Sequence, residues 1–351
     1  PPLAITRILS SLHSVGYTDN DFYNLDYYRH DDETIIEYFR KSNPDIIGIS
    51  AVVSTSYRYV KNLSHILRKH FPDTPQILCG NMAASSEIIL KKMPIDVCAS
   101  GPSDNTIIEL FKHWEKHGNF KASEELKKIQ GLAFLEEGDS LREEREAHFT
   151  GFAPTPPMKQ FDFDLLKHYG ADMDFYMPKG GTWPVFSRDP RSEEPHRLGK
   201  RRAHMLTTNG CVARCTFCHR WTKGYEMFGV DDTIEYIRYL MEEYNVGYVV
   251  FADENFGSSR KQLEELVEKI KPLDILWSAA GVRVRSVDRE ILTSMKEAGC
   301  VSVYYGIESG SESILKIMEK GSTVELNLNA IQATQQAGLY TIIQLVVGMP
   351  G

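Results

Sequence analysis

The stretch Thr207-Thr-Asn-Gly-Cys-Val-Ala-Arg-Cys-Thr-Phe-Cys-His219 brings three cysteines, Cys211, Cys215 and Cys218, into one short loop. Their C-x3-C-x2-C spacing is typical of a site for a soft metal, because thiolates are preferred ligands of zinc and of iron–sulfur clusters. A closed zinc site or a fully ligated cluster uses four protein ligands. Three thiolates therefore predict a metal centre with one coordination position left for a small molecule.

From this loop to the end of the chain, strand-like and helix-like runs alternate. Strands are expected at residues 203–208, 247–252, 274–280, 301–306 and 340–347. Amphipathic helices separate them, and a repeated βα unit of roughly 30–45 residues is typical of a barrel. We therefore expect a partial (β/α)6 barrel over residues 203–351, truncated before its last strand, with the cysteine loop after its first strand.

Polar residues follow the strands of this expected barrel. In a βα barrel, functional side chains lie at the carboxyl ends of the strands. The residues in question are Asp253, Glu254, Asn255, Arg283, Glu308, Ser309 and Gln344. Each also has a structural interpretation: the acids can be solvated or ion-paired, Arg283 can pair with an acid, and Gln344 can be a satisfied polar group of the barrel. Their convergence on one rim favours a binding site.

The first part of the chain predicts a second α/β domain. Buried strands are expected at 45–50, 76–80 and 96–100, a short strand at 22–28, and a closing hairpin at 131–137 and 140–146. Strands that alternate with helices form a doubly wound, flavodoxin- or Rossmann-like sheet, which binds ligands beyond its carboxyl edge. We expect this domain at residues 1–149. Residues 150–202, rich in proline, glycine and charge, are expected to form a connecting segment that lies over a site.

Length and composition agree with two domains. The chain has 351 residues, of which 42% are hydrophobic and 25% charged, as in globular proteins. The net charge of −8 argues against a nucleic-acid partner, which would need a basic face. No apolar run reaches the ~20 residues of a membrane helix, and no secretory signal is present. Because the chain begins without methionine and stops at Gly348-Met-Pro-Gly351, we expect it to be part of a longer protein.

Three further cysteines, Cys79, Cys98 and Cys300, lie singly in apolar, strand-like surroundings. We expect them to be buried and chemically inert. This pattern does not form a disulfide framework, and it is typical of a protein of the reducing cytoplasm.

Residues 203–351 resemble the radical S-adenosylmethionine (SAM) enzymes. The resemblance rests on the cysteine loop, the acidic end of the second strand, the segment Gly306-Ile-Glu-Ser-Gly-Ser311 and the terminal Gly-Met-Pro-Gly. It implies that the three loop cysteines ligate a [4Fe–4S] cluster and that SAM binds the fourth iron. An electron from the cluster would cleave SAM to a 5′-deoxyadenosyl radical. The resemblance assigns SAM contacts to Phe217, Asp253, Glu254, Asn255, Arg283, Glu308, Ser309 and Gln344.

The first domain resembles the cobalamin-binding domain found at the N-terminus of one branch of these enzymes. The matching phrases are Pro1-Pro-Leu, Asp45-Ile-Ile-Gly-Ile-Ser50 and Gln76-Ile-Leu-Cys-Gly80. The resemblance implies a cobalamin at the carboxyl edge of the sheet, in contact with Ser54, Thr55, Gly80 and Asn81. Two of these residues, Ser54 and Thr55, can equally cap the helix that follows. No Asp-x-His-x-x-Gly occurs, so no lower axial histidine is evident.

Together the resemblances imply a cobalamin-dependent radical SAM enzyme that methylates an unactivated carbon of a small molecule, with flavodoxin or ferredoxin as electron donor. Two alternatives remain. A non-methylating radical reaction, such as cyclisation or ring rearrangement, would use the same cofactors. A metal-stabilised binding protein without turnover would instead hold structural zinc, with His204 or His219 as the fourth ligand.

Overall fold

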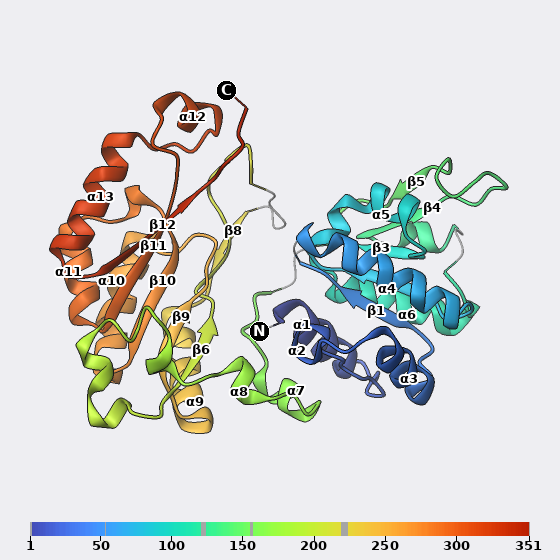
Figure 1. Ribbon diagram of the computed structural model, residues 1–351, viewed down its shortest axis with the longest axis horizontal. Coiled ribbons are helices and arrows are strands. Elements are labelled where there is room, and N and C mark those ends of the chain that lie inside the picture. Colours follow the sequence, from blue (N-terminus) through green and yellow to red (C-terminus); the bar gives the residue numbers. More distant parts are fainter. Residues whose placement is uncertain (1, 53, 121–123, 155–156, 219–223, 351) are drawn as a thin grey trace. The chain divides into compact units, whose positions relative to one another are not determined.

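The chain folds into two compact units. The computed structural model describes residues 2–52, 54–120, 124–154, 157–218 and 224–350, and of Ser54 only the backbone. The units are Pro2–Ala171 and Asp172–Gly351, hereafter the N-terminal and the C-terminal unit. Each contains its own sheet of mainly parallel strands (Figure 1). The predicted α/β fold class is therefore confirmed.

A five-stranded sheet in the order β1-β2-β3-β4-β5 forms the centre of the N-terminal unit. Its strands are β1 (Ile47–Ser50), β2 (Gln76–Cys79), β3 (Val97–Ala99), β4 (Leu132–Leu135) and β5 (Ala147–Phe149). The first three are parallel, whereas β4 and β5 are antiparallel to their neighbours. The second arm of the hairpin begins at Ala147 and not at residue 140, because the preceding residues form a mostly exposed, polar connection.

Helices cover both faces of this sheet. Apolar side chains of α1 (Leu3–Ser14) and α6 (Asp104–His117) pack on one face. The other face is covered by α3 (Asp32–Ser42), α4 (Tyr57–His70) and α5 (Ser86–Lys92). Two short helices, α2 (Leu25–Tyr28) and α7 (Phe163–His168), complete the unit.

The strand predicted at residues 22–28 is wrong, because its second half is helix α2. Asn24 starts this helix: its side-chain oxygen accepts hydrogen bonds from the amides of Asp26 and Tyr27, at 3.1 and 3.2 Å. Capping by asparagine therefore outweighs the strand preference of the aromatic residues here.

The C-terminal unit contains an all-parallel sheet in the order β12-β11-β10-β9-β6. Its strands are β6 (Arg201–Met205), β9 (Val246–Phe251), β10 (Leu276–Val282), β11 (Cys300–Glu308) and β12 (Tyr340–Leu345). The helices α9 (Val230–Tyr244), α10 (Arg260–Ile270), α11 (Arg289–Glu297) and α13 (Val324–Gln336) connect the strands and line one side of the sheet (Figure 1). A short helix, α12 (Glu312–Ile317), follows β11, and α8 (Met173–Tyr176) begins the unit. This order of strands and helices matches the predicted partial barrel.

Residues 183–197 pack at the amino-terminal ends of these strands. Phe186 is fully buried in a cluster with Tyr248, which lies in the first half of β9. The buried carboxylate of Asp189 accepts a hydrogen bond from the Nζ atom of Lys296, just before β11, at 2.7 Å. This part of the predicted connecting segment therefore lies at the end of the barrel strands opposite the cysteine loop, and not over that loop.

The cysteines outside the loop are buried, as predicted. Cys79, Cys98 and Cys300 are free thiols in the core. Burial raises the pKa of Cys79 to about 11 and that of Cys300 to about 12, so both thiols stay protonated near neutral pH. None of the helices in the described ranges is long and apolar enough to span a bilayer.

Candidate metal and cofactor site

The cysteine loop runs between two short antiparallel strands, β7 (Thr208–Gly210) and β8 (Tyr225–Met227). Thr216 anchors this loop to the end of α12. Its amide donates to the carbonyl oxygen of Met318 at 2.9 Å, and its hydroxyl group donates to that of Ile317 at 3.1 Å. The loop is thereby fixed at the carboxyl ends of the barrel strands, where functional groups of βα barrels gather.

The three thiols of the loop are accessible. Cys211 and Cys215 are half-buried, and Cys218 is exposed. The amide of Ala213 donates to the sulfur of Cys211 at 3.4 Å, and the amide of Cys218 donates to the carbonyl oxygen of Cys215 at 3.2 Å, which turns the loop back on itself.

The donor set of the loop tests which metal centre it fits. A closed zinc site uses four protein ligands, whereas the loop offers three thiolates, the ligand type of iron–sulfur clusters. The donor set therefore fits an iron–sulfur cluster that leaves one iron open.

Asp253, just beyond β9, holds the backbone that leads into the cysteine loop. Its carboxylate accepts hydrogen bonds from the amides of Thr207 and Thr208, at 2.8 and 2.6 Å, and from their hydroxyl groups, at 3.0 and 2.9 Å. Desolvation by burial raises the pKa of Asp253 to about 6, although these four hydrogen bonds oppose the rise. Both carboxylate oxygens are thus engaged by the loop, and Asp253 is a positioning residue in this structure.

Each of the two residues after Asp253 has a polar group that no described residue engages. Glu254 is solvent accessible, yet the protein around its carboxyl group raises its pKa by desolvation. No hydrogen bond or ion pair from a described residue engages that group. Asn255 is fully buried. Its Oδ1 atom accepts from the hydroxyl group of Ser258 at 2.8 Å, whereas its Nδ2 atom has no partner among the described residues. An open carboxylate and an open N–H donor fit the ammonium and carboxylate groups of an amino-acid moiety, such as that of SAM.

Close backbone contact between β9 and β10 builds this rim. Gly281 has a φ of +71°, and a Cβ atom there would lie 2.2 Å from the carbonyl oxygen of Asp253. The carbonyl oxygen of Gly281 accepts a hydrogen bond from the amide of Phe256 at 3.2 Å. Glycine is therefore required where the chain after β9 crosses β10.

Glu308, at the end of β11, is buried and ion-paired. The Nζ atom of Lys320 lies 2.8 Å from its carboxylate and 6.0 Å from the ring centre of Phe217 in the cysteine loop. The neighbouring Ser309 accepts a hydrogen bond from the amide of Ser311 at 3.1 Å. Glu308 therefore forms the ion pair that the sequence left open as an alternative to ligand binding. Sequence analysis missed Lys320, because no local motif marks a lysine after α12.

The other predicted residues of the rim differ in their surroundings. Arg283 is half-buried and forms no ion pair with a described residue, so its guanidinium group can bind a carboxylate. Gln344 is exposed on β12. His204 lies on β6, where burial lowers its pKa to about 4. Within the described ranges its Nδ1 atom has no hydrogen-bond partner. Of the two predicted zinc ligands, His204 does not gather with the thiols within 4.8 Å, and His219 lies outside the described residues.

The residues predicted to contact cobalamin follow β1 and β2 in the N-terminal unit. Gly80 has a φ of +83°, and a Cβ atom there would lie 2.6 Å from the carbonyl oxygen of Ala51, so glycine lets the turn after β2 pass close to β1. Asn81 and Thr55 are exposed, whereas the side chain of Ser54 lies outside the described residues. Exposed amide and hydroxyl groups at this edge fit a ligand that is rich in amide side chains, as cobalamin is.

Two protein families match this chain. Residues 205–351 match the Radical SAM superfamily, and residues 1–111 match the B12 binding domain. The first match contains the cysteine loop and the rim around it, and the second contains β1, β2 and β3 with the helices between them.

Individual proteins agree with these matches. The chain is 26% identical over 362 residues to an uncharacterised methyltransferase of Pyrococcus horikoshii, across 100% of this chain and 70% of that protein. It is 28% identical over 363 residues to the anaerobic magnesium-protoporphyrin IX monomethyl ester cyclase of Cereibacter sphaeroides, across 99% of this chain and 54% of that protein.

A solved structure shares the fold. The cobalamin-dependent S-adenosylmethionine radical enzyme OxsB, with aqua-cobalamin and S-adenosylmethionine bound, superposes with a TM-score of 0.69 at 20% identity, across 99% of this chain and 47% of that one. The chain thus spans about half of OxsB and of the cyclase, and 70% of the methyltransferase.

Proposed function

The chain belongs to the radical SAM enzymes that carry a B12-binding domain, and we propose that it is the catalytic region of a methyltransferase acting on an unactivated carbon of a small molecule. The observation that carries this proposal is the set of thiols and open polar groups at the carboxyl ends of the barrel strands. The loop with three thiols, the carboxyl group of Glu254, the Nδ2 atom of Asn255 and the guanidinium group of Arg283 all lie at the carboxyl ends of the barrel strands. No described residue pairs with these three polar groups. When bound, a [4Fe–4S] cluster supplies the electron that cleaves SAM, and cobalamin carries the methyl group.

The residues of the rim divide into those that bind and those that position. Cys211, Cys215 and Cys218 ligate iron. The carboxylate of Glu254 accepts hydrogen bonds from the ammonium group of SAM, and Arg283 pairs with its carboxylate. Asn255 donates its free N–H to the same amino-acid moiety.

Other residues shape the rim around the nucleoside. Asp253 holds the backbone before the cysteine loop, and Lys320 neutralises Glu308. The backbone at Phe217 and the hydroxyl group of Ser309 flank the adenosine part of SAM. Gln344, which is exposed on β12, is a further contact of SAM at the same rim.

Cobalamin occupies the carboxyl edge of the N-terminal sheet. Thr55 and Asn81 offer a hydroxyl and an amide group there, and Ser54 directly precedes Thr55. Gly80 lets the turn after β2 pass close to Ala51. The match of residues 1–111 to the B12 binding domain supports this assignment.

The net charge and the state of the cysteines bear on the substrate class and on the cellular location. A net charge of −8 supports a small-molecule substrate over a nucleic acid. All six cysteines are free thiols, which supports a reducing, cytoplasmic location. Such a location also contains flavodoxin and ferredoxin, the class of one-electron donor that the reaction needs.

The metal assignment is tested by anaerobic reconstitution of the full chain with iron and sulfide. We expect about four irons per chain and release of 5′-deoxyadenosine from SAM under reductant. The Cys215→Ala variant should lose both, because the cluster loses a ligand. The matched variant Cys79→Ala, which removes a core thiol, should keep both; equal behaviour of the two variants would show that Cys215 is not a ligand.

The reaction class is tested with SAM that carries a labelled methyl group. A methyltransferase transfers the label to cobalamin and then to the product. The similarity to the Cereibacter cyclase favours cyclisation as the second candidate. In that case 5′-deoxyadenosine forms, the labelled methyl group stays on the sulfur of the methionine released from SAM, and neither cobalamin nor the product is labelled. Zinc bound at the loop without iron or SAM cleavage would exclude both reactions.

A further inference from the structure

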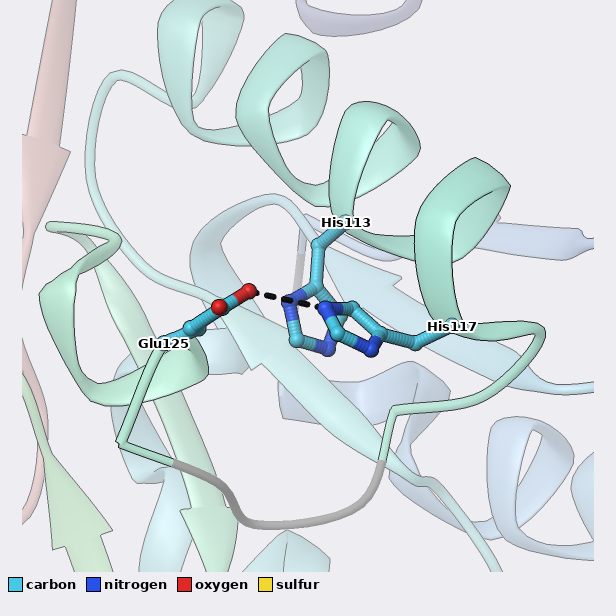
Figure 2. Close-up of side chains that lie close together, drawn as sticks. All are labelled: His113, His117 and Glu125. Atoms are coloured by element: carbon cyan, nitrogen blue, oxygen red, sulfur yellow. Dashed lines mark hydrogen bonds and ion pairs between the residues drawn. The ribbon is translucent and has the colours of Figure 1, made fainter.

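A second cluster of metal-binding side chains lies in the N-terminal unit, on the last turn of α6. His113 and His117 are one helical turn apart and therefore share a face of the helix. Glu125, which precedes the 3₁₀ turn Leu126–Lys128, points its carboxylate toward the two imidazole rings (Figure 2). One ligand atom from each of the three residues lies within 4.8 Å of the other two.

The geometry is close to that of a bound ion. The ring centres of His113 and His117 are 4.5 Å apart, and the Nε2 atom of His117 lies 2.8 Å from a carboxylate oxygen of Glu125. Ligand atoms around a tetrahedral zinc ion are about 3.4 Å apart, because Zn–N and Zn–O bonds are about 2.1 Å long. Small side-chain rotations therefore suffice to bring all three groups onto one ion.

The protonation of the groups also suits a cation. Burial and the neighbouring His117 lower the pKa of His113, so its imidazole is neutral near pH 7 and has a lone pair to donate. No hydrogen bond from a described residue reaches the ring of His113. The hydrogen bonds from Lys116 and His117 lower the pKa of Glu125 to about 2, so it is a carboxylate. Imidazole and carboxylate groups together are a known ligand set for zinc.

A lysine competes with the ion for the carboxylate. The Nζ atom of Lys116 lies 2.9 and 3.0 Å from the two carboxylate oxygens of Glu125. Lys116 is mostly exposed, and exposed ion pairs contribute little to stability. A divalent ion with two imidazole ligands can therefore displace this ammonium group.

We propose that His113, His117 and Glu125 form a binding site for a divalent transition-metal ion of the zinc class. The ion joins the C-terminus of α6 to Glu125, the residue before the 3₁₀ turn Leu126–Lys128. Its fourth position is open to water. This site is separate in sequence from the cysteine loop, and its existence does not depend on the proposed methyl transfer.

The test is a Co²⁺ titration of the full chain with its cluster already loaded, so that iron occupies the loop thiols. We expect one Co²⁺ per chain, with the visible d–d bands of a tetrahedral ion and without the near-ultraviolet sulfur-to-cobalt band that thiolate ligation gives. Zn²⁺ should displace the Co²⁺, and saturation should raise the melting temperature.

Variants decide which residues bind the ion. The Glu125→Gln and His113→Ala variants should each bind Co²⁺ at least ~10-fold more weakly, because even outer partners of metal ligands contribute that much. Glu125→Gln keeps the buried histidine, so it tests the site if His113→Ala folds poorly. Lys116→Met should bind more tightly, because it removes the competing ammonium group.

The matched control is His65→Ala, which removes an exposed histidine from α4. It should bind Co²⁺ like the unmodified chain. Equal affinity of Glu125→Gln and His65→Ala would overturn the proposal, as would a sulfur-to-cobalt band or the absence of binding. In the last case Glu125 forms only the hydrogen bonds to Lys116 and His117 that the structure shows.

Discussion

Replacing Asp253 by alanine should release the backbone before the cysteine loop. The carboxylate accepts hydrogen bonds from the amides of Thr207 and Thr208, both of which are buried. Alanine leaves these two N–H groups without an acceptor, whereas the two hydroxyl groups can rotate to other partners. The Asp253→Asn variant is the matched control, because its Oδ1 atom can still accept from both amides.

The expected size of the effect follows from the cost of an unpaired buried donor. Each unsatisfied N–H costs about 1–3 kcal/mol, which corresponds to about 5- to 150-fold faster opening of that amide. In Asp253→Asn the acceptor becomes neutral, and a neutral acceptor binds about half as strongly as a charged one. We therefore expect acceleration of no more than about fivefold in the asparagine variant.

Hydrogen exchange measured by mass spectrometry on a peptide that covers residues 206–210 reads these amides directly. A peptide from β12 serves as the internal reference and should exchange at the same rate in all three proteins. If the alanine variant exchanges at residues 206–210 no faster than the asparagine variant, the carboxylate does not hold the loop. Iron content after reconstitution should fall in the same order, with alanine lowest.

Three further predictions concern the same unit. Asp189→Ala should lower the free energy of unfolding by about 3 kcal/mol, because Arg191 loses its buried partner. SAM cleavage at 25 °C should persist, and a loss of cleavage without a loss of stability would contradict this prediction. Gly281→Ala should lower the free energy of unfolding, measured in urea, by more than about 2 kcal/mol, because φ at this position is +71° and the new Cβ atom would meet backbone atoms. The control Gly310→Ala, which has open space around its Cβ position, should leave the free energy of unfolding unchanged. Asp253 has a pKa of about 6 in the folded chain against about 4 in the unfolded chain, so the folded state binds its proton more tightly. The free energy of unfolding should therefore fall by about 2 kcal/mol as the pH rises from 4 to 6. This slope should be absent in Asp253→Asn, and an identical pH profile of the two proteins would refute it.

The strands and the composition of the rim could be predicted from the sequence. Val246–Phe251 is an uninterrupted apolar run, and all six residues are buried, within one residue of the expected bounds. Because parallel strands all end at one edge, knowing where each strand stops was enough to place Asp253, Arg283 and Glu308 on the same rim.

Contacts that are distant in sequence could not be predicted. The acids at the strand ends look alike in sequence, yet Asp253 is engaged by two threonines, Glu308 by Lys320, and Glu254 by no described residue. These differences depend on which backbone passes nearby, which no local pattern records. The segment around Phe186 has no periodicity, so its packing beneath the sheet also becomes visible only in three dimensions.

Residues 183–197 lie at the amino-terminal ends of the strands, and they provide an attachment point on the C-terminal unit away from the cysteine loop. Leu198, directly after this segment, is 68% exposed, and the strands separate it from the cysteine loop at their opposite end. A surface anchor or fluorescent reporter attached there would leave the cysteine loop open to cofactors and substrate. Immobilised in this orientation, the chain could be washed, reconstituted and assayed repeatedly in an anaerobic flow cell.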